Sequence, residues 1–148
     1  MEWFPSEISL PITQRARKVI PLARREARKF GAPDALSEHL LLAVVAEGGG
    51  VAAKVLKGLD VTGRTIRRVL KTGIAADRVH DEPVGRCIER AEGAALRLGH
   101  STIGTEHFLI GMVDAGTCRA CLLLKELVPR VEGIPDLLIK IMAAPRRP

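Results

Sequence analysis

The sequence carries one pattern twice, at a constant spacing of 68 residues. The stretch "SEHLLLAV", residues 37–44, returns as "TEHFLIGM", residues 105–112. The same shift, without a gap, aligns apolar and glycine positions on both sides of this stretch, among them Ile20 with Ile88, Gly31 with Gly99, Leu41 with Leu109, Gly48 with Gly116 and Leu56 with Leu124. The chain is therefore an internal duplication, and its fold must consist of two equivalent units.

Each copy predicts four helices. In the first copy, Thr13 can cap a helix whose apolar residues recur at three-and-four spacing until Gly31 ends it. Pro21 lies inside this helix and is expected to bend it or remove one hydrogen bond. The next helix, "EHLLLAVVAE", is capped by Ser37 and is apolar on nearly every side, which is typical of a buried helix. Two shorter helices, "VAAKVLKG" and "RTIRRVLKTG", complete the copy.

The second copy repeats this plan, with helices expected over Glu82–Gly99, Thr105–Ala115 and Thr117–Leu127 and a last one opening near Pro135. Only 3% of the residues are aromatic, so the core must consist of Leu, Ile, Val and Ala, a composition that favours helices. We predict an all-α fold of two tandem four-helix repeats, eight helices in total, related by a pseudo-twofold axis. Its expected parts are an N-terminal extension (1–12), repeat one (13–72), a linker (73–81), repeat two (82–142) and a disordered tail (143–148).

Composition limits the cellular locations and the classes of partner that the sequence favours. No apolar run approaches the roughly 20 residues that a membrane span needs, and the first residues lack the pattern of a signal peptide. Three cysteines are too few, and odd in number, for a secreted disulfide scaffold. We therefore expect a cytoplasmic protein without membrane contact. The formal net charge of +6 permits nucleic acid, acidic proteins or phosphorylated ligands as partners and selects none of them.

The two Glu-His pairs invite a metal or acid-base interpretation. A helical zinc protease needs two histidines four residues apart on one helix, whereas each helix here carries one. We predict no metal and no cofactor. With Ser37 and Thr105 as N-caps, Glu38 and Glu106 lie in the first helical turn, where the helix dipole stabilises an exposed carboxylate by roughly 0.3–1 kcal/mol. His39 and His107 are expected to point inward and bond a neighbouring carbonyl group.

Two further motifs resemble those of enzymes, but the predicted secondary structure around each does not fit the corresponding active site. Cys118-Arg-Ala-Cys121 resembles a redox motif, but that motif follows a strand in a βαβ unit. Cys87 and Cys121 align with Val19 and Ala53 of the other copy, which indicates packing. The stretch "GLDVTGRT", residues 58–65, has an arginine where a phosphate loop needs lysine, and it follows a helix. We expect no enzymatic activity.

The first helix is strongly basic, with a single glutamate among Arg15, Arg17, Lys18, Arg24, Arg25, Arg28 and Lys29. A solvated outer face is the simpler interpretation. Nucleic-acid binding is the alternative from another class, although a recognition helix and base-stacking aromatic residues are lacking.

The residues resemble one family. A duplicated unit with a small-residue helix, a glycine, and then an [ST]-E-H-x-[LI] helix followed by glycine and "AxxxL" is similar to the amino-terminal domain of the ClpA/ClpC-type AAA+ unfoldases. The stretch "AALRLGHSTIGTEHFLIGMVDAGTCRACLLL" carries the likeness best. The resemblance implies a non-enzymatic binding module, here as a stand-alone domain without ATPase rings, that recognises adaptor or substrate proteins of a Clp system. An accessory subunit or decoy that docks on the Clp ATPase or protease itself is the alternative.

In some members the resemblance further implies recognition of phosphorylated arginine on substrates. The glutamate of each motif grips the guanidinium, and a threonine at the start of each half lies near the phosphate. This assigns Glu38, Glu106, Thr13 and Thr105 to ligand binding, with carboxylate and helix N-terminus as suitable partners for the two charges. Asp81 stands where a second Thr13 would be and should repel a phosphate. We therefore expect Glu38, accompanied by Thr13, to form the better site.

Overall fold

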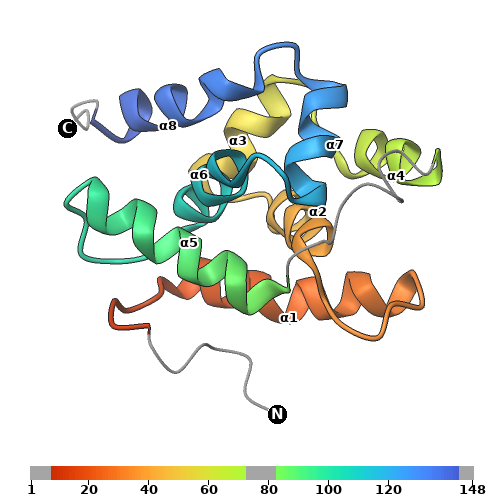
Figure 1. Ribbon diagram of the computed structural model, residues 1–148, viewed down its shortest axis with the longest axis horizontal. Helices are drawn as coiled ribbons and strands as arrows, with labels where there is room; N and C mark the ends of the chain where they lie inside the picture. The colour runs from red at the N-terminus through yellow and green to blue at the C-terminus, as the bar shows by residue number, and fades with distance from the viewer. Residues whose placement is uncertain (1–7, 73–82, 144–148) are drawn as a thin grey trace.

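The computed structural model describes residues 8–72 and 83–143, and within these ranges the chain forms eight α-helices, one 3-10 turn and two isolated β-bridges (Figure 1). The first half contains α1 (Gln14–Lys29), α2 (Ser37–Glu47), α3 (Val51–Gly58) and α4 (Gly63–Lys71). The second contains α5 (Val84–Arg97), α6 (Thr105–Ala115), α7 (Arg119–Leu127), η1 (Val131–Gly133) and α8 (Ile134–Ala143). The predicted all-α duplicated fold is confirmed. The predicted linker 73–81, and nearly all of the predicted tail 143–148, lie outside the described residues.

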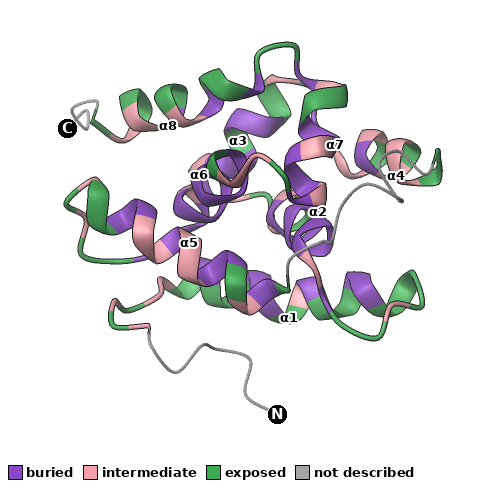
Figure 2. Ribbon diagram, viewed as in Figure 1, coloured by how far each residue is buried: buried purple, intermediate pink, exposed green. Residues whose placement is uncertain are grey.

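Helices α2 and α6 form the centre of the domain. Helix α1 packs on α2, and its equivalent α5 packs on α6. Because α2 and α6 are apolar on nearly all sides, each needs cover from several directions, and Figure 2 shows both as largely buried. The halves supply this cover to each other, since α7 contacts α2 and α3 contacts α6.

The duplication extends to the backbone. Gly31 follows α1 with φ of 69°, and Gly99 follows α5 with φ of 73°. This left-handed conformation favours glycine, so the two helices end in the same way at equivalent positions. Helix α1 continues without interruption through Pro21, which is exposed and lacks a backbone donor.

Two helix starts differ from expectation. Helix α7 begins at Arg119 and not at Thr117, because its N-cap Cys118 has extended backbone angles (φ −71°, ψ 158°). The Thr117 hydroxyl donates to the Ala115 carbonyl, 3.3 Å away, in the turn that leaves α6. Helix α5 begins at Val84 with Pro83 as its N-cap, while the expected start at residue 82 lies outside the described residues.

No single helix in the described part of the chain is long and apolar enough to cross a membrane. Two bent pairs, α2 with α3 at 92° and α6 with α7 at 89°, reach that length and composition only together. The burial of α2 and α6 in the centre of the domain accounts for their apolar sequences.

The contact between α5 and α6 is close at Gly111, which gives a first prediction. A Cβ atom at this position would lie 3.1 Å from the Arg90 backbone carbon and 3.2 Å from the Ala91 nitrogen. Gly111→Leu is expected to lower the free energy of unfolding by about 1–3 kcal/mol through overpacking, measured by urea denaturation. Gly58→Leu is the matched control, because nothing lies within 4 Å of a Cβ there. Equal effects of the two substitutions would contradict this account of the packing.

Candidate functional site

The histidines of the two Glu-His pairs cap their own helices. The N-cap residues are Leu36 for α2 and Gly104 for α6. The Leu36 N–H donates to His39 Nδ1 at 3.0 Å, and the Gly104 N–H donates to His107 Nδ1 at 2.9 Å. Both imidazoles are buried, as predicted, but they accept backbone N–H groups where a bond to a carbonyl group was expected. They thereby satisfy donors that a helix start leaves without intrahelical partners.

Ser37 and Thr105 are consequently not the caps of their own helices, and that prediction was wrong. Each hydroxyl lies instead at a helix start in the other half. Ser37 Oγ accepts from the Ala120 N–H, in the first turn of α7, at 3.1 Å. Thr105 Oγ1 lies where a side chain at Gly50, the N-cap of α3, would have to be. The first turns of α2 and α6 are thus fixed against helices of the opposite repeat.

The starts of α1 and α5 also form hydrogen bonds with the opposite repeat. The Thr13 N–H donates to the Ile103 carbonyl, and the Ile103 N–H donates to the Pro11 carbonyl, each at 2.9 Å. In the other half, the Val84 N–H donates to the Ala35 carbonyl at 3.2 Å. The start of α1 therefore lies beside the start of α6, and the start of α5 lies beside the start of α2.

We call these two places the Glu106 end (residues 103–107 with Thr13 and Gly50) and the Glu38 end (residues 35–39 with Pro83, Val84 and Arg119). The sequence pairs Thr13 with Glu38, but in the structure Thr13 belongs to the Glu106 end. The Phe30 ring, just after α1, lies 5.9 Å from the His39 ring, centroid to centroid, so the far end of α1 is next to Glu38. A helix of 16 residues is about 24 Å long, which puts Thr13 at the opposite end, beside the residues that precede Glu106. Asp81 lies outside the described residues.

The two glutamates have different surroundings, although both lie in the first helical turn as predicted. Glu38 is only 7% exposed, whereas an exposed carboxylate was expected. Its Oε2 lies 3.0 Å from Arg119 Nε, and its Oε1 lies 3.7 Å from His39 Nε2. Arg119 thus forms an ion pair with Glu38 in a largely buried position.

The Glu106 side chain is 22% exposed and bends back over the backbone of Gly104. Its Oε1 lies 3.7 Å from His107 Nδ1. Within residues 8–72 and 83–143, no lysine or arginine nitrogen lies within 4.0 Å of this carboxylate. The Glu106 end therefore presents a carboxylate without a cationic side chain in contact.

His107 is held neutral by its surroundings. Burial lowers its pKa, and the nearby His100 lowers it further, while the negative charge of Glu106 acts in the opposite direction. Because Nδ1 accepts the Gly104 N–H, the ring proton belongs on Nε2, which donates to His100 Nδ1 at 2.8 Å. The imidazole is thus a neutral structural element behind Glu106.

The cysteines are packing residues, as predicted. Cys87, Cys118 and Cys121 are buried and unbridged. The Cys118 and Cys121 thiols point to the carbonyls of Met112 and Val113, at 3.5 and 3.7 Å. Burial raises the pKa of Cys121, which disfavours the reactive thiolate. In the described parts of the chain, no group of three His, Cys, Asp or Glu residues could hold a metal ion.

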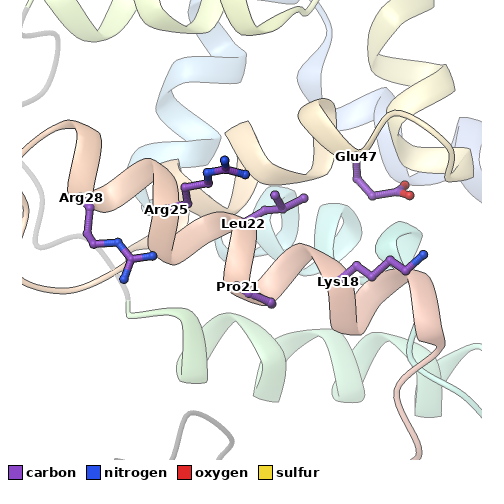
Figure 3. A pocket seen from close by; sticks show the side chains of 6 residues that line it. All are labelled: Lys18, Pro21, Leu22, Arg25, Arg28 and Glu47. Atoms are coloured by element: carbon purple, nitrogen blue, oxygen red, sulfur yellow. The ribbon is translucent and has the colours of Figure 1, made fainter.

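The basic residues of α1 form a separate surface. All seven are exposed, in agreement with a solvated outer face. A groove of about 550 Å³ lies on this helix, and Figure 3 shows its lining side chains, which come from α1 except for the last: Lys18, Pro21, Leu22, Arg25, Arg28 and Glu47. Arg15, at the start of the helix, is held by Glu47 (Nε to Oε1, 3.3 Å) and by the Gly49 carbonyl (2.7 Å).

Comparison with known proteins decides the family. The family model of the Clp repeat (R) N-terminal domain matches residues 11–127, which covers the first repeat and the second through α7. The chain belongs to this family.

Relatives of this Clp repeat domain include much longer proteins. The chain is 36% identical over 121 residues to the negative regulator of genetic competence ClpC/MecB of Bacillus subtilis, covering 78% of this chain and 15% of that protein. It is 36% identical over 137 residues to a ClpA homolog, an ATP-dependent Clp protease ATP-binding subunit of Porphyra purpurea, covering 88% and 17%. The chain thus spans about 15% of the length of the curated relatives that it matches.

The fold is also known from solved structures. The crystal structure of the N-terminal domain of the chaperone ClpD from Arabidopsis thaliana matches with a TM-score of 0.67 and 17% identity, over 95% of this chain and all of that one. At this identity the likeness shows the fold alone.

Sequence reasoning missed one residue of the Clp repeat domain's candidate site, Arg119. The alignment of the copies places Arg119 opposite Val51, but neighbouring positions such as 117 and 118 also differ, so this mismatch did not stand out. Its meaning became visible only when α7 was seen to pack on α2.

The neutral state of His107 predicts a pH-dependent contribution to stability. Above its ordinary pKa of 6.5 the group is neutral in both states and the contribution is constant. As the pH falls through that value towards the lowered folded-state pKa, the unfolded chain binds a proton that the folded chain does not, so the free energy of unfolding decreases.

His107→Asn should remove this part of the decrease, because Asn Oδ1 can still accept the Gly104 N–H but does not titrate. The measurement is urea unfolding of both proteins at a series of pH values from about 8 to 5. Identical slopes for the variant and the wild type would show that the pKa of His107 is not lowered.

Proposed function

We propose that this Clp repeat domain is a non-enzymatic binding module that recognises adaptor or substrate proteins of a Clp chaperone and protease system. Membership of the Clp repeat family supports this proposal. The matched relatives are named as Clp chaperones and ATP-binding subunits of an ATP-dependent Clp protease, and this chain corresponds to a small part of each. A binding role fits a domain in which the buried His39 and His107 cap helices and the cysteines are buried in the core.

Within this role we propose that the Glu106 end binds an arginine side chain, with phosphoarginine as its best ligand. The observation that carries the proposal is the 2.9 Å hydrogen bond from the Thr13 N–H to the Ile103 carbonyl. It joins the start of α1 to the residues that precede Glu106. A guanidinium can then donate paired N–H bonds to the Glu106 carboxylate, while a phosphate on the same group faces a helix N-terminus.

The start of α1 suits an anion. Thr13 Oγ1 accepts from the Ala16 N–H at 3.2 Å, and this fixes the first turn of the helix. Helix geometry gives the Gln14 and Arg15 N–H groups no intrahelical acceptor, and the helix dipole makes this end positive. The Arg15 side chain also lies close to the other half, because a Cβ at Gly50 would meet both Arg15 and Thr105. Thr105 in turn is the residue directly before Glu106.

Substitution of Glu106 tests the ligand. Glu106→Gln keeps the size of the side chain but removes its charge, and should weaken binding of free phosphoarginine at least about tenfold, the loss expected for one hydrogen bond to a charged group. Isothermal titration calorimetry measures the affinity. Glu126→Gln, at an exposed position of α7, is the matched control and should bind like the wild type.

Unmodified arginine should bind more weakly than phosphoarginine, because it lacks the group that faces α1. No heat from the wild type at millimolar phosphoarginine would overturn the ligand assignment. A mobility shift of DNA that weakens steeply with salt would instead favour nucleic-acid binding through the basic face of α1.

A further inference from the structure

Arg119 brings a guanidinium of the chain itself to Glu38. Its Nε lies 3.0 Å from Glu38 Oε2, with 24% of the arginine side chain and 10% of the glutamate side chain exposed. The position equivalent to Arg119 in the first copy is Val51, and the residue equivalent to Glu38 is Glu106. The duplication has therefore produced two similar acceptors, of which one is matched with an arginine and the other with a valine.

Local geometry holds Arg119 at this place. It is the first residue of α7, and the next residue, Ala120, donates its N–H to Ser37 Oγ at 3.1 Å. Two consecutive residues of α7 thus contact two consecutive residues of α2. A positive charge at a helix N-terminus is unfavourable because of the helix dipole. The ion pair with Glu38 offsets this cost, whereas Val51 at the start of α3 carries no charge.

We propose that Arg119 is a built-in occupant of the Glu38 acceptor, so that the domain binds one arginine-type ligand, at Glu106, and not two. This inference rests on the proposed function of the glutamates. A ligand guanidinium would have to displace Arg119, which competes as a tethered group at the millimolar or higher effective concentration typical of an intramolecular partner. Among residues 8–72 and 83–143, Glu106, whose equivalent neighbour is a valine, has no such competitor within 4.0 Å.

The first test opens the closed acceptor. Arg119→Val introduces the residue that the other repeat carries at the equivalent position, the first residue of α3. All titrations of this test are made in an Asp81→Thr background, because Asp81 stands where the second copy would carry Thr13 and should repel a phosphate. In that background the chain should bind free phosphoarginine with a stoichiometry of one, and with Arg119→Val added a stoichiometry of two, by isothermal titration calorimetry. In the Glu106→Gln background, which should bind at least about tenfold more weakly, Arg119→Val should restore one site of the original affinity, and adding Glu38→Gln should remove it again.

The second test closes the open acceptor. Val51→Arg places a guanidinium at the equivalent start of α3 and should weaken phosphoarginine binding at Glu106 at least about tenfold. Val51→Leu is the matched control for size and should leave the affinity within about twofold of the wild type. If Val51→Arg and Val51→Leu bind alike, an arginine at this position does not close an acceptor and the inference is overturned.

The outcomes separate this inference from the proposed function. Binding by the wild type that Glu106→Gln abolishes and that Arg119→Val fails to restore would leave the function intact and refute the closure. Binding that survives Glu106→Gln but not Glu38→Gln would show that Glu38 is open, which refutes both the closure and the assignment of the ligand to Glu106. If no variant binds the ligand, the function proposed for the glutamates fails and the inference fails with it.

A measurement of stability without ligand tests the ion pair itself and does not depend on the binding experiments. A double-mutant cycle with Arg119→Gln and Glu38→Gln, which keep the side-chain stems, should show a favourable coupling in the free energy of unfolding. No coupling would mean that the ion pair is absent in solution, which overturns the inference whatever the ligand does. Arg119→Gln also replaces Arg119→Val in the titrations should the valine variant not fold.

Discussion

Each half of the domain holds the start of the other half's central helix. The hydrogen bond between Thr13 and Ile103 ties the start of α1 to α6, and the one between Ser37 and Ala120 ties the start of α2 to α7. These contacts matter because α2 and α6 are apolar on nearly all sides and one repeat cannot cover either of them. The core is consequently shared, and both candidate binding ends are built from residues of both halves.

The sequence was sufficient for the helices and insufficient for the contacts between them. Helix positions follow from local signals, such as apolar spacing and the glycines after α1 and α5, whose backbone angles agree at equivalent positions. The repeat offset identifies which positions are equivalent, but it does not show whether a residue contacts its own repeat or the other one. The sequence alone therefore pairs Thr13 with the glutamate of its own copy, whereas in the structure Thr13 bonds to Ile103, just before Glu106.

Capping shows how a tertiary contact overrides a local rule. A serine before an apolar run is a good N-cap in isolation, and the sequence predicts this role for Ser37. In the folded chain His39 satisfies the N–H of Leu36, so Ser37 Oγ can instead receive the N–H of Ala120 from the other repeat. The glutamate that follows is drawn into the same junction. Its burial against Arg119 could not be predicted without knowing that α7 packs there.

At the binding ends the two copies keep the same Glu-His pair and differ in the residue beside the glutamate. In the core some equivalent pairs are identical, such as Leu41 and Leu109, and others differ in volume, such as Leu40 and Phe108. At the helix starts the copies diverge, with valine at 51 and arginine at 119. The Glu38 end thereby carries a neutralised pair, whereas the Glu106 end keeps a carboxylate beside the positive start of α1. Opposite charges placed side by side suit a ligand that itself joins a cation to an anion, and among the described residues the Glu106 end has that arrangement.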